Sequence, residues 1–168
     1  STTTLDGSVD GDVDVNAGGE LTLGSAERIA AGSALNVDGI LNTNGEETVT
    51  SLTATGTLNG EGTVSALTYD LTGATVNANL GTGALTSNGG TALNGNTNAD
   101  TVTVASGTLT VDGALTSNTA QVTVQGGANL AANGTVEASN INVDNGATLT
   151  TGEAERLNNE VSLVTNGT

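Results

Sequence analysis

One ten-residue phrase, x-V-x-V-x-x-G-x-x-L, recurs along the chain and constrains its fold more than any other feature. Each copy begins with alternating polar and apolar residues and then reaches a glycine, as in the stretches 12–21, 121–130 and 140–149, with a shortened copy at 101–109. Alternation bounded by Gly and Asn predicts short β-strands separated by tight turns. A looser copy carries Leu35, Val37, Gly39 and Leu41. Corresponding residues of neighbouring copies lie 19 to 22 positions apart, and a period near 20 is the length of one coil of a solenoid.

The sequence therefore predicts an all-β fold, a parallel β-helix (β-solenoid) with about 20 residues in each of roughly eight coils. Each Val or Leu is expected to lie above its counterpart one coil below, at a strand spacing of roughly 4.8 Å. The interior is predicted to be a thin column of aliphatic side chains with no room for Phe or Trp, and the chain contains neither. Gly and Asn are expected at the corners because both tolerate positive φ, and Asn side chains can also stack as a ladder.

A second similarity spans a longer distance. Residues 13–39 align without a gap with residues 141–167, at an offset of 128. The matched residues are Val15, Gly18, Leu21, Thr22, Gly24, Ala26, Glu27, Arg28, Leu35 and Gly39 with Val143, Gly146, Leu149, Thr150, Gly152, Ala154, Glu155, Arg156, Leu163 and Gly167. We interpret residues 1–168 as a single solenoid domain made of one 128-residue unit and the start of the next. Such a chain is either cut from a tandem array or a subunit whose two ends resemble each other.

Both arginines of the protein lie inside this match, in the segments 25–29 and 153–157. These segments have the helix-favouring composition Ala-Glu-Arg followed by Ile or Leu. They predict a short helical turn or a corner excursion, with each Arg paired to a neighbouring Glu. The alternative is a specific docking contact between units.

The composition excludes several classes of function. Without His or Cys, the chain cannot build zinc, haem, iron–sulfur or triad-type sites. A net charge of −16 with only Arg28 and Arg156 positive makes nucleic acids and anionic membranes poor partners. No stretch approaches 18 consecutive apolar residues, so we expect no insertion into a membrane.

Carboxylates are the remaining chemistry. Asp10, Asp12 and Asp14 alternate as oxygen ligands of calcium do, but the central Gly and closing Glu of an EF-hand loop are missing. We expect these side chains to lie on the solvent face and the protein to need no cofactor, with loose calcium bridging as the alternative. Glu46, Glu47 and Glu61 are candidate acids of a glycosidase. With no Trp, Phe or Lys to hold a sugar, we predict that the protein is not an enzyme.

Three stretches carry a resemblance to a known group of proteins. Gly-Thr-Leu-Thr-Val-Asp-Gly at 107–113, Asn-Gly-Ala-Thr-Leu-Thr at 145–150 and Leu-Asn-Gly-Glu-Gly-Thr-Val at 58–64 resemble the passengers of bacterial autotransporters and haemagglutinin-type adhesins. The resemblance is one of repeat style and covers most of the chain. It implies a right-handed parallel β-helix on a Gram-negative cell surface, in the extracellular space, with roles in adhesion, aggregation and matrix building.

Two functions follow as expectations. In the first, the chain is an extracellular structural protein that builds a surface fibre or biofilm matrix by stacking head to tail on further copies of itself. Its assembly contacts are predicted at Leu5, Val9, Val161, Leu163 and Val164, because the unpaired strand edges of a solenoid lie at its ends. Proline at Val161 or Val164 is then expected to abolish polymers.

In the second, the chain is a fragment of an autotransporter-type adhesin with a binding surface for a receptor or glycan on a host or neighbouring cell. An insertion that interrupts the coils would favour this function. Residues 86–100 are the best candidate, although we interpret them as a corner rich in Gly and Asn.

Overall fold

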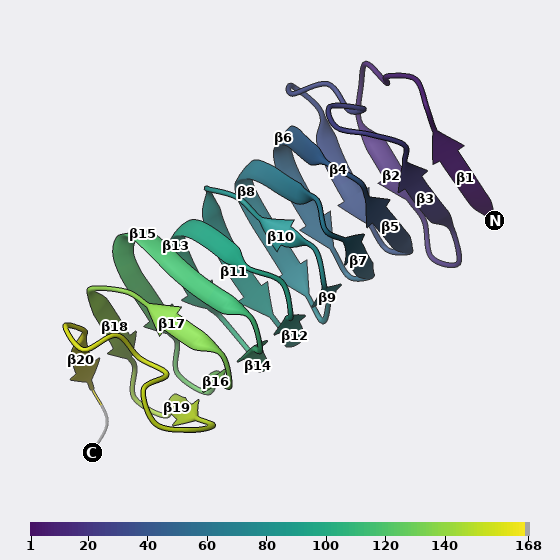
Figure 1. Ribbon diagram of the computed structural model, residues 1–168. Helices are drawn as coiled ribbons and strands as arrows, with labels where there is room; N and C mark the ends of the chain where they lie inside the picture. The colour runs from purple at the N-terminus through teal and green to yellow at the C-terminus, as the bar shows by residue number, and fades with distance from the viewer. Residues whose placement is uncertain (167–168) are drawn as a thin grey trace.

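The computed structural model describes residues 1–166, and of these the side chains of residues 118–120 are left aside. Residues 1–166 contain no helix and form about nine stacked turns of a β-solenoid, with roughly 18 residues in each turn. The N-terminus and the C-terminus lie at opposite ends of the stack (Figure 1). The predicted all-β parallel solenoid is confirmed, but the coils are shorter and more numerous than expected. Within this described range, no helix has the length and apolarity needed to cross a membrane.

One side of every turn belongs to a nine-stranded parallel sheet. In stacking order its strands are β1 (Thr2–Leu5), β3 (Glu20–Leu23), β5 (Ile40–Thr43), β7 (Thr57–Gly60), β9 (Thr75–Val76), β12 (Gly90–Leu93), β14 (Thr108–Val111), β16 (Asn129–Ala132) and β19 (Thr148–Thr151).

The rest of each turn belongs to an eleven-stranded parallel sheet. Its main path is β2 (Val13–Val15), β4 (Ala34–Val37), β6 (Glu46–Ala54), β8 (Thr63–Thr72), β10 (Asn79–Leu80), β13 (Thr97–Val104), β15 (Ala114–Val124), β18 (Asn140–Val143) and β20 (Ser162–Thr165). The start of β8 pairs with β10, and its end pairs with β11 (Ala84–Asn88). In the same way the start of β15 pairs with β17 (Thr135–Glu137) and its end with β18. These turns therefore have three strand segments, whereas the turn of β3 and β4 has two.

The number of residues per turn varies along the stack. It is 22 from Val13 to its partner Leu35, 17 from Leu35 to Leu52, and 16 from Tyr69 to Leu85. The copies of the sequence phrase lie in the longer turns, which is why their spacing predicted too few coils.

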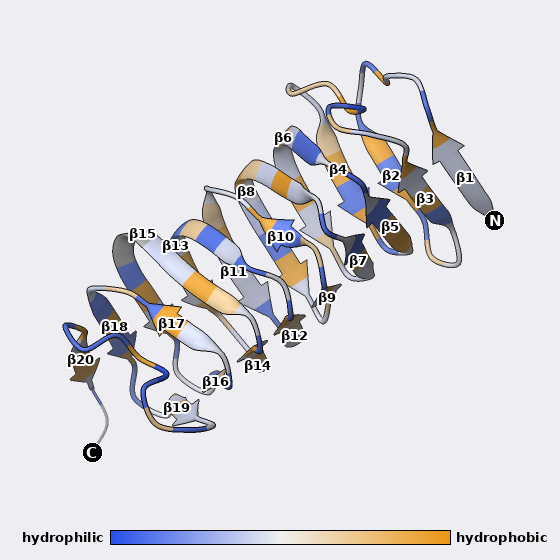
Figure 2. Cartoon of the chain, viewed as in Figure 1, coloured by the Kyte–Doolittle hydropathy of each residue, from blue (hydrophilic) through white to orange (hydrophobic). Residues whose placement is uncertain are grey.

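The core is a column of side chains that lie in register from turn to turn. In the second sheet the successive partners are Leu35, Leu52, Tyr69, Leu85, Val102, Val122 and Ile141, none more than 1% exposed. A matching column in the first sheet consists of Leu41, Leu58, Val76, Leu93, Val111 and Ala132, each fully buried. Apolar and polar residues follow one another along the strands (Figure 2), because one side chain points into this column and the next to solvent.

The only aromatic residue of the chain, Tyr69, is part of the column. Its hydroxyl accepts a hydrogen bond from the Ala66 N–H at 2.9 Å and lies 3.0 Å from the carbonyl oxygens of Val64 and Thr82, to which it can donate. Burial raises the pKa of Tyr69 to about 12. The expectation of a purely aliphatic interior was therefore wrong here, and polar side chains such as Glu47, Ser87 and Thr91 are buried at other turns.

Six of the ten glycines with positive φ in the described residues stand where the second sheet ends and the chain turns into the first. They are Gly73, Gly89 and the glycines of the three complete copies and the shortened copy of the sequence phrase, Gly18, Gly107, Gly127 and Gly146, whose φ lies between 67° and 85°. The left-handed conformation is open to glycine at little cost. The prediction that glycine occupies corners is confirmed.

Asparagines form the predicted ladder on the outer surface. The side-chain amide of Asn42 donates to the Glu20 carboxylate at 2.8 Å. Asn59 donates to Asn42 at 3.3 Å, Asn77 to Asn59 at 2.7 Å, and Asn94 to Asn77 at 2.7 Å. Every bond joins one turn to the next, so these side chains connect the stack in addition to the backbone bonds of the sheets.

The two similar sequence segments have the same structure. β3 and β19 coincide under the offset of 128, and so do β4 and β20. The non-glycine residues with positive φ are Glu27 (52°) and Glu155 (61°) in the part of the chain that the structure describes, and they are also 128 apart. The last matched residue, Gly167, lies outside the described residues.

Candidate functional site

The first strand forms one edge of the nine-stranded sheet. β1 pairs with β3 only, and the carbonyl oxygens of Ser1 and Leu5 accept hydrogen bonds from Glu20 and Gly24 of the next turn. In a parallel ladder alternate residues bond to opposite sides. The backbone groups of Thr2 and Thr4 therefore point away from the stack, toward an unpaired edge.

The N-terminal end of the core column is open. A hollow of about 450 Å³ lies there, and its apolar lining includes Leu5, Val9, Val13, Val15 and Leu21. All of these except Val15 are partly exposed. The structure thus places two of the predicted assembly residues, Leu5 and Val9, at the end of the column, where a further turn would cover them.

The C-terminal end is open in the same way. A hollow of about 320 Å³ is lined by Val143, Ala147, Leu149, Leu163 and Thr165, among others. Leu163 pairs with the buried Ile141 and is itself 48% exposed, so it ends the core column of the second sheet. Val161 packs against the core beside it.

Val164 lies differently from the other predicted assembly residues. It pairs with Asn142, whose side chain is on the outer surface, so Val164 does not belong to the core column. Ser162 and Asn166 donate their N–H groups to β18 and its preceding turn, at Ser139 and Val143. By alternation Val164 also bonds to β18, and the unpaired edge is made by the N–H and C=O groups of Leu163 and Thr165.

This alternation corrects the choice of proline positions. The N–H of Val161 donates to Asn158 within its own turn at 3.2 Å, and that of Val164 faces β18. Proline at either position would damage the monomer itself. Positions 163 and 165 are the ones where proline removes an N–H group that faces the open edge.

Two segments protrude from the stack, and they are the two that contain the arginines. One runs from residue 24 to 33, between β3 and β4, and the other from 152 to 161, between β19 and β20. Neither is helical, so the predicted helical turn was wrong and the corner excursion is what forms. Arg156 pairs with Glu153 at 2.7 Å as expected, whereas Arg28 donates to Ser25 and not to a Glu.

Glu47 has a role that the sequence did not reveal. Its side chain is 1% exposed, and its carboxylate accepts hydrogen bonds from the N–H of Arg28 at 2.9 Å and of Ile29 at 3.0 Å. It therefore holds the first protruding segment onto the following turn. Glu46 and Glu61, the other acids considered from the sequence, are exposed.

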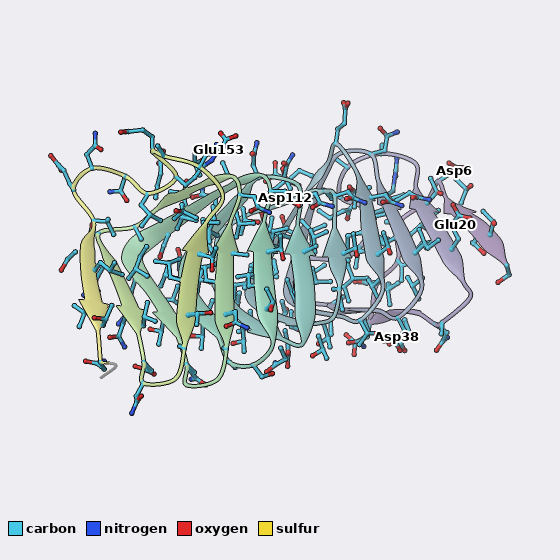
Figure 3. All side chains as sticks on the ribbon, turned by 90° about the horizontal axis from the view of Figure 1, so that it is seen from below. Asp6, Glu20, Asp38, Asp112 and Glu153 are labelled. Atoms are coloured by element: carbon cyan, nitrogen blue, oxygen red, sulfur yellow. The ribbon has the colours of Figure 1, made fainter. Side chains whose placement is uncertain are left out.

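The aspartates of the first turns bond to the next turn. Asp12 accepts the Ala34 N–H at 2.8 Å, and Asp14 accepts the Asn36 amide at 2.7 Å, while Asp10 is exposed. No group of three acidic side chains placed to share a metal ion occurs among residues 1–166. Other acidic residues are spread along the stack, from Asp6 and Glu20 at one end to Glu153 at the other (Figure 3).

Residues 86–100 are an ordinary part of the solenoid. They contain the end of β11, all of β12 and the start of β13, and Thr91, Leu93 and Thr97 are buried there. No insertion interrupts the coils here, but the segment is not only a corner, because most of its residues lie in strands.

No protein-family model, curated protein or solved structure matches this chain.

Proposed function

We propose that the chain is a structural module whose ends stack on further turns of β-solenoid, so that copies joined head to tail build an extracellular fibre or matrix. The resemblance to autotransporter passengers and haemagglutinin-type adhesins is the reason for placing it on a bacterial surface. The partner is a second copy of the chain.

One observation carries the proposal. The segment 141–165 folds like the segment 13–37, yet the two are covered differently. Turn 40–54 lies on the first segment, with β5 on β3 and β6 on β4, whereas no residue of 1–166 lies on β19 or β20 beyond their single partners. The uncovered face of the segment 141–165 is thus similar to the face of the segment 13–37 on which the next turn of the same molecule lies.

The physical driving force is the same as that between internal turns. Stacking would pair the open backbone groups of Leu163 and Thr165, and it would remove Leu5, Val9 and Leu149 from water. Each fully buried aliphatic side chain contributes about 1.5–3 kcal/mol. The charge of −16 opposes contact between the long sides of two rods and favours growth along the axis, because charges repel most where surfaces run parallel.

Electron microscopy and sedimentation velocity test the proposal. The chain is expected to form uniform filaments at about 0.15 M salt, where charges more than about 8 Å apart are screened. Leu163→Pro and Thr165→Pro should give monomers with unchanged circular dichroism. Val164→Ser, which alters the outer surface of the same strand, is the matched control and should still form filaments.

Filaments that persist in both proline variants, or a parent chain that stays monomeric, would contradict the proposal. A parallel series in millimolar calcium gives a separate answer. Filaments that need calcium would favour the loose bridging site at Asp10, Asp12 and Asp14.

A further inference from the structure

The first protruding segment holds a carboxylate with consecutive backbone N–H groups. The N–H of Glu27 donates to the Glu46 carbonyl at 2.9 Å. The next two, of Arg28 and Ile29, donate to the two carboxylate oxygens of Glu47. The positive φ of Glu27 turns these groups to the same side, which is the geometry of a backbone anion site.

The second protruding segment is built in the same way. Glu155 has the same left-handed φ as Glu27. Arg156 donates three residues back to Glu153, as Arg28 does to Ser25, and the Nε atoms of both arginines are buried without a partner. Leu157 forms a β-bridge with the previous turn at Val136, matching the bridge between Ile29 and Val9.

The two segments differ in the hydrogen-bond acceptors of these N–H groups. Val136 bonds to the Arg156 carbonyl and to the Asn158 N–H, so the N–H of Leu157 points away from the previous turn, as that of Ile29 does. Within residues 1–166 no acceptor lies on the N–H groups of Glu155, Arg156 or Leu157. The second segment therefore has the conformation of the first, but no glutamate accepts its N–H groups within residues 1–166.

We propose that Glu155, Arg156 and Leu157 form a carboxylate seat, which receives a glutamate side chain from a solenoid turn stacked on the C-terminal end. The occupant is a turn like residues 40–56, with a glutamate at the position of Glu47. The proposal goes beyond the proposed function, because the turn that fills the seat differs from the N-terminal turn that another copy of the chain would stack there. The sequence match between 25–29 and 153–157 then reflects the same contact with a following turn, which at 153–157 is a docking contact between units.

The seat distinguishes between possible neighbours. The N-terminal turn of another copy carries Val9 where a glutamate is required, since Val9 is the residue that bridges to Ile29 from the other side. A turn with the sequence of residues 40–56 carries the glutamate itself. The acidic side chains of Glu153 and Glu160, which replace Ser25 and Gly32, weaken the attraction for a second carboxylate, and the ion pair of Arg156 with Glu153 offsets part of this effect.

An extended chain tests the seat without association between copies. A second copy of residues 41–72 is attached after Thr168, with the copied glutamate either retained or replaced by Leu. Amide hydrogen exchange of Arg156 and Leu157 is expected to be about tenfold slower, or more, with glutamate than with Leu. Arg28 and Ile29, which keep Glu47 in both proteins, are the internal control and should exchange equally in both.

Equal exchange of Arg156 and Leu157 in the two extended chains would overturn the proposal.

If the added turn does not fold, the Leu149 and Thr151 amides at the open edge of β19 will stay unprotected. The original chain is then titrated with sodium acetate against sodium chloride. Amide shifts at Arg156 and Leu157, without shifts at Arg28 and Ile29, would support the seat, and the absence of such shifts would overturn it. Both measurements are independent of whether the original chain forms filaments.

Discussion

Gly83 leaves the space in which the ring of Tyr69 lies. A Cβ atom at position 83 would be 2.9 Å from the ring carbon Cε2 of Tyr69 and 2.0 Å from the Ala66 carbonyl oxygen. The φ of Gly83 is 136°, which side chains disfavour. One glycine thus admits an aromatic ring into a column of aliphatic side chains.

Gly83→Ala is therefore expected to lower the free energy of unfolding by about 3 kcal/mol, because the ring and the backbone must both move. Chemical denaturation monitored by circular dichroism measures the change. Gly7→Ala is the control, since a Cβ atom at position 7 would have no neighbour within 4 Å and the φ of Gly7 is not positive. Its effect should stay within about 0.5 kcal/mol. A similar stability for the two variants would contradict the packing described.

Alkaline pH should destabilise the fold through Tyr69. Its pKa is raised to about 12 in the folded protein, against about 10 in an unfolded chain. The folded state holds the tyrosine proton more tightly than the unfolded state does. The resulting contribution to the free energy of unfolding is complete below pH 10 and is lost as the pH rises through 12, a loss of about 3 kcal/mol. Because Tyr69 is the only aromatic residue, absorbance at the tyrosinate band reports on it alone. Ionisation near pH 10 with the fold intact would contradict the buried hydroxyl.

Replacing Glu47 should cost more stability than replacing an exposed glutamate. Glu47→Leu leaves the N–H groups of Arg28 and Ile29 without an acceptor, at about 1–3 kcal/mol each. Glu47→Gln retains one oxygen and should cost about half as much. Thermal or urea unfolding measures both, with the exposed neighbour Glu46→Gln as control. A Leu variant as stable as the control would show that the carboxylate does not hold the segment.

The asparagine ladder should show coupling between neighbouring turns. Asn59→Ala and Asn77→Ala each remove a bond at a shared contact, so the double variant should lose less than the sum of the two, by about 0.5–1 kcal/mol. Asn59 with Asn142, which lies several turns away, provides an additive reference pair. Strict additivity for Asn59 and Asn77 would mean that their bond contributes nothing measurable.

The fold was accessible from the sequence because the same local rule acts at every turn. Val13, Val15 and Gly18 belong to an alternation and a corner that repeat along the chain. The stacking of Asn42 and Asn59 was expected from the ability of Asn side chains to form a ladder, although both lie within strands, β5 and β7, and not at corners. The number of coils was not accessible. Turns such as Leu52 to Tyr69 contain no complete phrase, and they are shorter because no segment protrudes from them.

The buried carboxylate was out of reach for a different reason. Glu47 has the same parity as the apolar Val49 in β6, so alternation favours its inner face, but burying a carboxylate is costly unless it finds hydrogen-bond donors. The donors are the N–H groups of Arg28 and Ile29, which are turned toward Glu47 by the left-handed φ of a residue one turn earlier. Sequence patterns of period 2 contain no information on such a contact between turns.

The stack of partners in register also determines how the molecule responds to force. Each turn is held only by the turn before and the turn after, so stability accumulates along a line. The last turn, which ends in the exposed strand β20, has a neighbour on one side alone. A pull on the C-terminus should therefore peel the solenoid turn by turn, each of roughly 18 residues releasing about 60 Å of chain. Single-molecule stretching would record these releases as a series of steps. The rod would then lengthen under load by the loss of successive turns and would not act as a rigid spacer.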